Sequence, residues 1–552
     1  MAPPRDHHED EDDSEPELLA AEDAMEEIGD DDGDDVAMDS GADDDDDEME
    51  ELLLVNDSIA YFDAHRDSVF AIAQHPRYPS LVATGGSEGD GDDAPGKGYV
   101  VDTSAAVSRP VLPPSFSSDP AAMAHRSVQL EPVFAIDGHT DSINTLAFTQ
   151  PNGDFLVSGG LDGRMRVYSV AVRPSPDANV AFRFVAEAQE VPEINWLAAC
   201  PAPAHPNTIA LGASDGSVWV YTIDNSAADP AAALQIVQSY FLHTASCTAG
   251  VWSPDGQLLA TVSEDSSLHV WDVWGAASAK GITSSSSSTG GQTVVSLTAT
   301  DQRFEVDGGL FSVAISPGGG VVAVGGAGGL IKIVGLPRLS GVGSSVAGGG
   351  AGGKTARSAA AGRQSAAAAQ AGTILASLQV QSDGVETLAF APPPLTLLAA
   401  GSVDGSVTVY DASRSFAVRR HIAAAHDEFS VVKVEWVRSP PIASASASAS
   451  AAAAAAGPAQ WLLTSCGMDG VVRRWDLRAN AAASVAPRNP AAAAAATAAQ
   501  PGSGATPAGL VREWRGHRGD GEGGGVLGFV QGETGERVIT AGDDGVVLVF
   551  EA

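Results

Sequence analysis

Basic side chains are scarce in this sequence. Its 552 residues hold 30 lysines and arginines against 71 aspartates and glutamates, which gives a formal net charge of −41. Direct binding to DNA or RNA needs bases that neutralise phosphates, and anionic membranes attract bases in the same way, so the composition argues against both classes of partner. Long apolar runs are missing as well, since none reaches the roughly 18 residues of a membrane span.

Cysteine is nearly absent too. Cys200, Cys247 and Cys466 lie far apart and form no Cys-x-x-Cys pair, so neither a zinc ligand set nor a disulfide framework is expected. The N-terminus carries acids where a signal peptide needs a basic start and an apolar core. We therefore expect a cytoplasmic protein. The nucleus stays open as a second location, although no clear basic import signal is present.

The charge divides the chain into a tail and a body. Residues 1–51 hold 26 of the acids and a single base, Arg5, and such a segment cannot bury enough apolar surface to order itself. We expect a disordered acidic tail over 1–51 and a folded body over 52–552. Four low-complexity stretches in the body are rich in Ala, Gly, Ser or Pro and are expected to be inserted loops, at about 275–292, 338–372, 439–459 and 479–509.

Between these inserts the sequence repeats. Each unit has an alternating apolar run, an apolar strand, an Asp-centred turn and a second strand that ends in an aromatic residue, as in LVSGGLDGRMRVYSV (156–170) and LLATVSEDSSLHVWDV (258–273). Two short strands joined by an Asp-Gly turn indicate a β-hairpin. Eight such units can be counted, two of them with degenerate hairpins at 81–103 and 321–336.

These units resemble the WD40 family. The marks are a Gly-His pair (Gly138-His139 and Gly516-His517), the Asp-Gly turn and a closing Trp-Asp pair (Trp271-Asp272 and Trp475-Asp476). The resemblance implies an all-β WD40 β-propeller with four strands per blade, and eight units imply eight blades. The last unit lacks a fourth strand, so we expect residues 57–63 to supply it and to close the ring, which protects the sheet edges.

A buried polar set is expected in four blades, because an Asp buried at a tight turn must be paired. In WD40 blades a His, a Ser or Thr, an Asp and an aromatic residue form this set. The candidates are His139, Ser158, Asp162 and Tyr168; His243, Thr261, Asp265 and Trp271; His426, Ser465, Asp469 and Trp475; and His517, Thr540 and Asp544, where Phe550 cannot donate a hydrogen bond. Blade 5 has lost the Asp. The set recurs at one repeat position, so it is interpreted as structural and not as a catalytic triad.

Two motifs resemble enzyme sites. Residues 348–355 match the P-loop pattern but lie inside an insert, away from the strand and helix that a P-loop needs. Residues 212–216 match the Gly-x-Ser-x-Gly elbow but lie in a strand–strand hairpin instead of a strand–helix turn. We therefore expect no enzyme, no catalytic residue, no metal site and no cofactor.

An acid stands just before, or at the start of, the first strand of most units. In a propeller these loops converge on one face, where the carboxylates would focus a negative potential that suits Arg and Lys. The alternative is that such an acid only holds its turn. The candidate partner-binding residues are Asp67, Asp141, Glu193, Asp307, Asp383, Glu428 and Asp520, with Glu386, Glu264 and Trp196 added to them. Trp196 is expected either to be exposed near this face or to pack in the core.

The body also resembles one family within this fold. The acidic tail, the opening DSIAYFDAHRDSVFAIAQHP (57–76) and the PEINW step (192–196) are similar to the WD-repeat ribosome-assembly chaperones of fungi and to the animal angio-associated migratory cell protein. The resemblance implies a monomeric chaperone that holds the basic N-terminal segment of a newly made large-subunit ribosomal protein, the universal protein sixteen or L-ten, on an acidic face. Its partner would be a basic protein segment, with no direct contact to nucleic acid or membrane.

Two other functions stay open at this point. One is a general WD-repeat scaffold of the signalling or migration type, which would show no preference for basic partners. The other is a substrate receptor of a cullin-type ubiquitin ligase, because Trp475-Asp476-Leu477-Arg478 fits the Trp-Asp-x-Arg string with which some WD-repeat receptors reach their adaptor.

Overall fold

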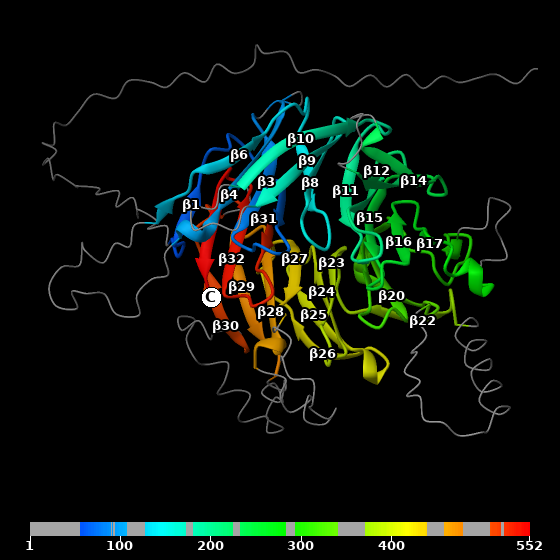
Figure 1. Ribbon diagram of the computed structural model, residues 1–552. Helices are drawn as coiled ribbons and strands as arrows, with labels where there is room; N and C mark the ends of the chain where they lie inside the picture. The colour runs from blue at the N-terminus through cyan, green and yellow to red at the C-terminus, as the bar shows by residue number, and fades with distance from the viewer. Residues whose placement is uncertain are drawn as a thin grey trace, which may run out of the picture. The chain divides into compact units, whose positions relative to one another are not determined.

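The computed structural model describes the body of the chain, in which residues 54–552 form one compact unit. The described residues are 56–89, 91, 94–106, 127–172, 180–224, 232–282, 293–339, 370–438, 458–478, 508–519 and 524–552. Strands dominate them, and their helices are short 3-10 turns (Figure 1). None of the helices in these ranges is long or apolar enough to cross a lipid bilayer.

Eight antiparallel sheets, here called blades and numbered along the chain, make up this unit. Blade 1 runs from its inner strand outward as β2 (Ala71–Gln74), β3 (Leu81–Ser87), β4 (Gly96–Asp102) and β6 (Pro132–Ile136). Blade 2 holds β7 (Ile143–Phe148), β8 (Phe155–Gly160), β9 (Met165–Val172) and β10 (Val180–Ala188). Blade 3 holds β11 (Ile194–Ala199), β12 (Thr208–Ala213), β13 (Val218–Ile223) and β14 (Leu234–Tyr240). Blade 4 holds β15 (Cys247–Trp252), β16 (Leu258–Ser263), β17 (Leu268–Asp272) and β18 (Thr293–Leu297).

The second half of the chain repeats the arrangement. Blade 5 holds β19 (Leu310–Ile315), β20 (Val321–Gly326), β21 (Leu330–Gly335) and β22 (Ile374–Gln379). Blade 6 holds β23 (Val385–Phe390), β24 (Leu397–Ser402), β25 (Val407–Asp411) and β26 (Ala417–Ile422). Blade 7 holds β27 (Val431–Trp436), β28 (Leu462–Gly467), β29 (Val472–Asp476) and β30 (Leu510–Trp514). Blade 8 holds β31 (Val526–Val530), β32 (Arg537–Gly542) and β33 (Val547–Glu551). The 3-10 turns are η1 (Thr103–Ala105), η4 (Ser278–Lys280), η5 (Ala327–Gly329), η6 (Ala412–Arg414) and η7 (Pro458–Trp461).

The ring closes through the N-terminal strand. Strand β1 (Ala60–Phe62) pairs antiparallel with β33, with Ala60 opposite Val549, and so becomes the fourth strand of blade 8. In Figure 1 the blue β1 lies beside the red C-terminal strands. The predicted eight-bladed propeller and its closing strand are thus confirmed. The structure adds a fifth strand, β5 (Val128–Gln129), which pairs parallel with β1 and has no counterpart in the predicted repeat.

The hydrophobic core is divided into eight clusters, each of which lies between two neighbouring blades. The cluster around Trp475 joins blades 6 and 7, for example, and the cluster around Phe529 joins blades 7 and 8. Each strand alternates its side chains between the two faces of its sheet, so both faces of every blade are covered by a neighbour. A blade therefore depends on the ring for most of its burial, as expected for a repeat that cannot bury its faces alone.

Blade 5 is complete although its turn lacks the aspartate. Its second and third strands are joined by η5, in which Gly328 and Gly329 have φ values of +63° and +73°. A Cβ at Gly329 would stand 1.9 Å from the carbonyl oxygen of Gln381 in the next blade. Glycine suits this turn because it adopts a positive φ without strain and has no Cβ to clash with the next blade.

The borders of two predicted inserts pack onto the core, contrary to expectation. Residues 275–282 contain η4 and bury Ala277, and Leu339 is also buried in the cluster between blades 4 and 5. Both apolar side chains fill space beside the outer strands of these blades. The central parts of the four inserts and the acidic tail lie outside the described residues.

Candidate functional site

One backbone contact recurs in all eight blades and locates the predicted site. At the start of each inner strand, a carbonyl oxygen accepts a hydrogen bond from the first amide of the turn between the second and third strands. The pairs are Ser87 to Ser68 at 3.3 Å, Leu161 to Ser142 at 3.0 Å, Ser214 to Glu193 at 3.2 Å, Glu264 to Ser246 at 3.1 Å, Ala327 to Gly309 at 3.2 Å, Val403 to Gly384 at 2.9 Å, Met468 to Ser430 at 3.0 Å and Asp543 to Gly525 at 2.9 Å. We call the end of the ring that bears these eight carbonyl groups the loop face.

The predicted acids lie on the loop face at matching positions. Asp67, Asp141 and Asp383 directly precede the recurring carbonyl, and Glu193 bears it. Asp307 and Glu428 stand two residues before it, Glu386 stands two residues after it, and Glu264 donates the matching amide. Asp520, the candidate in blade 8, lies outside the described residues. The structure therefore brings together carboxylates from six of the inter-blade loops.

Three of these acids support their own turns. The Oδ1 atoms of Asp67, Asp141 and Asp383 accept hydrogen bonds from the amide of the following residue at 2.8, 2.6 and 2.7 Å. This is the local role that the sequence left open for an aspartate next to a strand. Their charges still add to the potential of the face, but their replacement would also disturb the loops.

Three other acids do not support a turn in this way. Glu193, Asp307 and Glu428 are exposed, and among the described residues none of them forms an ion pair. Among the bases of the inter-blade loops, Arg66 is paired with Glu88 at 3.5 Å and Arg303 with Asp301 at 2.7 Å, whereas Arg518 before β31 is exposed and forms no ion pair with a described residue. The loop face therefore presents unpaired negative charge, the arrangement that attracts Arg and Lys.

Glu386 differs from its neighbours in its electrostatics. It projects from the inner strand β23, beside Asp383. Loss of surrounding water raises the pKa of Glu386, and the Asp383 carboxylate raises it further. The positive charge of a base bound between these two carboxylates would lower the pKa of Glu386 and favour its ionised form.

Trp196 packs in the core, the second of the two expected placements, so its place as an exposed binding residue is wrong. Only 9% of the side chain is exposed, and it packs in the cluster between blades 3 and 4. The indole lies over Gly212 and Gly250, and a Cβ on either glycine would overlap the ring. The two glycines leave a space that a large aromatic side chain fills, so burial outweighs exposure here.

The polar sets are buried in the blades, as a structural role requires. In blade 7, His426 Nδ1 lies 2.9 Å from Asp469 Oδ1, and Nε2 lies 2.8 Å from Ser465 Oγ, which accepts a third bond from Trp475 Nε1 at 2.9 Å. Burial alone would raise the pKa of Asp469, but the hydrogen bond from His426 and the charge of Arg473 hold it below its usual range. The set ties an inter-blade loop to β28, to β29 and to the turn between these two strands.

Two members of the predicted sets are placed differently. In blade 4, His243 Nδ1 bonds Ser267 Oγ at 2.6 Å and leaves Asp265 3.9 Å away, because Asp265 accepts from the amides of Thr244 and Ser267. Thr261 joins His243 Nε2 and Trp271 Nε1, each at 2.8 Å. Asp265 still belongs to the turn, with Ser267 interposed between it and the histidine.

In blade 2, His139 bonds Ser158 at 2.8 Å and Asp162 at 3.1 Å. The Tyr168 hydroxyl instead accepts from Arg166 Nε at 3.1 Å and donates to the carbonyl oxygen of Asp137 at 3.4 Å. A phenol is shaped differently from an indole and carries its polar atom at the end of the ring. In blade 8, His517 bonds Thr540 at 2.7 Å and Asp544 at 3.0 Å, and Phe550 adds no donor.

Sequence reasoning missed two related sets. In blade 1, His65 Nε2 lies 2.9 Å from Thr84 Oγ1, and burial, with a smaller effect of Lys97, lowers the pKa of His65 to about 4. In blade 6, Gln381 replaces the histidine and donates to Ser406 Oγ at 3.0 Å. His65 and Thr84 are 19 residues apart, as are His139 and Ser158, so this shared spacing could have identified the set of blade 1 from the sequence.

The enzyme-like and ligase-like motifs have structural roles or lie outside the described residues. Residues 348–355, which match the P-loop pattern, lie outside the described residues. Residues 212–216 end β12 and turn directly toward β13. Trp475 is fully buried, and Arg478 pairs with Asp476. Within the described ranges, no cluster of three or more His, Cys, Asp or Glu side chains could hold a metal ion. The three cysteines are buried and free.

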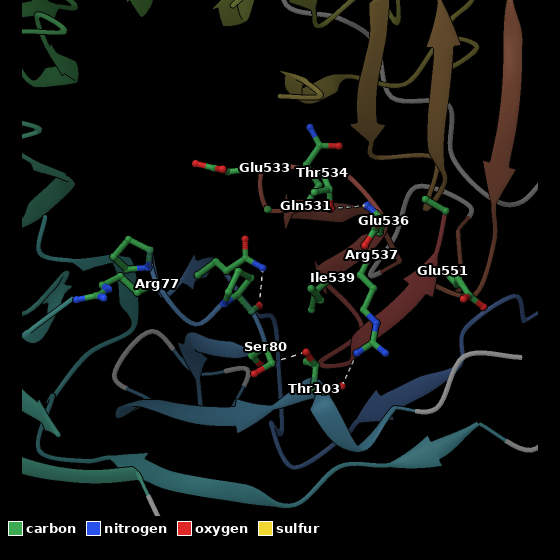
Figure 2. A pocket seen from close by; sticks show the side chains of 15 residues that line it. Arg77, Ser80, Thr103, Gln531, Glu533, Thr534, Glu536, Arg537, Ile539 and Glu551 are labelled. Carbon is green, nitrogen blue, oxygen red and sulfur yellow. Dashed lines mark hydrogen bonds between the residues drawn. The ribbon is translucent and has the colours of Figure 1, made fainter. Parts of the chain in front are cut away.

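A cavity of about 750 Å³ opens at the opposite end of the ring, between blades 8 and 1 (Figure 2). Arg77, Glu533, Glu536 and Arg537 line it, so its charge is mixed. Arg537 donates to the carbonyl oxygens of Thr103 and Ala106 at 2.8 and 2.7 Å and holds the seam together. Compared with the loop face, this cavity offers little net charge to a ligand.

Comparisons with known proteins agree with this fold. The family model described as "WD domain, G-beta repeat" matches residues 130–169, 234–272 and 372–411. A crystal structure of Chaetomium thermophilum Sqt1 bound to the N-terminus of the ribosomal protein L10 is 58% identical in sequence. It covers 90% of this chain and 100% of its own, with a TM-score of 0.70.

Two further relatives are more distant. The ribosome assembly protein SQT1 of Saccharomyces cerevisiae is 31% identical over 39% of this chain and 42% of its own length, so the match spans less than half of the yeast protein. The human angio-associated migratory cell protein is 20% identical over 77% of this chain and 71% of its own.

Proposed function

The chain belongs to the Sqt1 family of WD-repeat proteins, and we propose that it is a ribosome assembly chaperone that binds the basic N-terminal segment of a large-subunit ribosomal protein on its loop face. The proposed partner is the counterpart of ribosomal protein L10, whose N-terminus is bound in the structure of the related Chaetomium protein. The proposed function is binding without catalysis, and its place is the cytoplasm, where ribosomal proteins are made.

One observation carries this proposal: Glu193, Asp307 and Glu428 present exposed carboxylates with no ion pair among the described residues. They come from three different inter-blade loops of the same face, so an extended segment can reach them in turn. A carboxylate can accept two parallel hydrogen bonds from an arginine, which favours arginine over an uncharged donor.

The net charge of the whole chain supports the same role. A free basic segment binds RNA without specificity, because its bases neutralise phosphates. An acidic face competes with phosphate for the same bases, while a chain with a net charge of −41 repels RNA. The protein can therefore hold a basic segment away from nucleic acid until the segment is delivered.

The test is a titration of the labelled N-terminal peptide of the ribosomal protein with the full chain and with the triple variant Glu193→Lys, Asp307→Lys and Glu428→Lys. These residues hold no turn, so the variant should fold, which circular dichroism can check. We expect at least a hundredfold weaker binding to the variant, because attraction at three sites becomes repulsion.

The matched control places the same charge change at the opposite end of the ring. Glu131, Glu533 and Glu536 are exposed and lie in loops of blades 1 and 8 that face away from the loop face. Their replacement by lysine should weaken binding only a few-fold, through the long-range field. Equal losses in the two variants, or no binding by the unaltered chain, would contradict the proposal.

A further inference from the structure

The inner strands carry a second recurring feature on the loop face. In seven inner strands, the register of pairing with the next strand of the blade shifts at the inner strand's second residue, which forms a β-bulge. These strands are β7, β11, β15, β19, β23, β27 and β31. Phe70 holds the equivalent position in blade 1, just before β2. A bulge re-aims a side chain. We call these eight residues the mouth ring: Phe70, Asn144, Asn195, Thr248, Phe311, Glu386, Val432 and Leu527.

The mouth ring is polar and bonded in blades 2 to 4. Asn144 donates to the carbonyl oxygen of Asn195 at 3.1 Å, and Asn195 donates to Ser246 Oγ at 2.8 Å and to the carbonyl oxygen of Cys247 at 3.0 Å. Thr248 donates to the carbonyl oxygen of Leu310 at 2.6 Å. Each side chain thus reaches the start of the next blade, and its donor capacity is used within the ring.

The mouth ring is apolar at Phe311 in blade 5 and, without a break, in the three adjacent blades 7, 8 and 1. Val432 and Leu527 are partly exposed, and 41% of Phe70 is exposed. Their strands β27, β31 and β2 are neighbours around the ring. We call these three residues the apolar arc. Unlike the polar members, they have no hydrogen bonds to make. Val432 also packs against the cluster between blades 7 and 8, and all three leave apolar surface in water on the loop face.

Acids flank the apolar arc. Asp427 and Glu428 precede β27, Asp67 precedes Phe70 by three residues, and Asp543 lies next to Ser68, whose hydroxyl donates to it at 2.6 Å. A ligand side chain in the arc would therefore have carboxylates on either side of it. Such a surface matches a segment in which an uncharged bulky residue stands between bases.

We propose that the apolar arc is a subsite for one bulky apolar or aromatic side chain of the bound segment, flanked by Arg or Lys residues that pair with Asp67 and Glu428. This inference rests on the proposed function, which it deepens by naming a sequence feature of the partner. The carboxylates supply long-range attraction, and the arc selects among basic segments, because apolar burial is insensitive to moderate salt.

The test uses two basic peptides of the same length and charge that differ only in a central phenylalanine or serine. The full chain should bind the phenylalanine peptide about tenfold more tightly, as expected for burial of part of an aromatic side chain. This ratio should change less than twofold between low and moderate salt, although both affinities fall.

The variant Phe70→Ser should reduce the ratio below about threefold, and Leu527→Asn provides a second variant should the first not fold. The control Phe184→Ser makes the same change at a side chain that is 42% exposed on the outer strand β10, and it should keep the tenfold ratio. Equal affinities of the unaltered chain for the two peptides, or an unchanged ratio in Phe70→Ser, would overturn this inference while leaving the proposed function in place. No binding of either peptide would overturn both.

Discussion

The buried hydroxyls of the polar sets show how single residues stabilise a blade. Thr261 Oγ1 accepts a hydrogen bond from Trp271 Nε1 and shares another with His243 Nε2. In the equivalent set Thr540 is bonded to His517 alone, because Phe550 has no donor, and its hydroxyl also lies 3.4 Å from the carbonyl oxygen of Leu548. All of these groups are buried. A buried donor that loses its partner costs about 1–3 kcal/mol.

We therefore expect Thr261→Val to lower the free energy of unfolding about twice as much as Thr540→Val. The two changes are identical in shape, and they leave two unsatisfied groups in blade 4 and one in blade 8. Urea denaturation followed by tryptophan fluorescence measures the difference. Equal losses would show that the hydrogen bond of the tryptophan contributes nothing to stability.

The buried histidines make stability depend on pH. Burial, aided by Lys97, lowers the pKa of His65 to about 4, from an ordinary value of 6.5. Between these two values the unfolded chain binds the proton and the folded chain does not, so stability falls as the pH is lowered from 6.5 toward 4. His269, with a pKa of about 3 for reasons of burial and the neighbouring His243, acts in the same direction.

His65→Gln tests this contribution, and glutamine is a suitable replacement because Gln381 occupies the same place in blade 6. The unaltered chain should lose about 2 kcal/mol more stability than the variant when the pH falls from 7 to 4.5. The measurement is the difference between urea denaturation curves at the two pH values. Parallel losses in both proteins would contradict the assignment to His65.

Within the blades and the loop face, the burial and contacts of individual side chains were the features that the sequence predicted least well. The position of each described acid followed from the repeat, because the repeat aligns the inter-blade loops with the start of an inner strand. The burial of Trp196 did not follow, since it depends on Gly212 and Gly250 in two different blades. The bond of Tyr168 to Asp137 likewise depends on the side-chain shape within one blade.

At the scale of elements, the closing strand β1 decides whether the ring holds together. It covers the free edge of β33, and its Phe62 is 1% exposed in the cluster between blades 8 and 1. The unpaired edge of the last unit made this strand predictable from the sequence. The fifth strand β5 and the bulges of the inner strands were not predictable, because neither follows from a hydrophobic period.

Phe62→Ala should therefore lower the free energy of unfolding by about 3–5 kcal/mol, as expected for truncation of a buried phenylalanine. The matched change Phe184→Ala at an exposed position should cost less than about 1 kcal/mol. Limited proteolysis should also cut the Phe62→Ala variant first near blade 8 or its closing strand. A similar stability of the two variants would mean that ring closure does not limit stability.

At the scale of the whole molecule, charge and topology act together. The eightfold repeat places every inter-blade loop at one end of the ring, and the composition makes those loops acidic. Strands of six residues separate the two ends by about 20 Å, which exceeds the Debye length of about 8 Å at physiological salt. The two ends can therefore differ in the partners that they attract.

Binding of the basic N-terminal segment should consequently weaken with salt. We expect the dissociation constant to rise at least tenfold between 50 and 300 mM sodium chloride for the unaltered chain. The triple lysine variant of the loop face should show little dependence on salt at any measurable affinity. Binding that is tight and independent of salt would point instead to a general scaffold.

Binding on the loop face is tested most directly by photo-crosslinking from a single photoreactive side chain in the middle of the bound N-terminal peptide, with the sites on the full chain identified by mass spectrometry. Binding on the loop face should give crosslinks within the segments 65–70, 190–195, 305–311, 383–386 and 427–432. Crosslinks concentrated at the opposite end of the ring, in 76–80, 254–257 or 531–537, would contradict it.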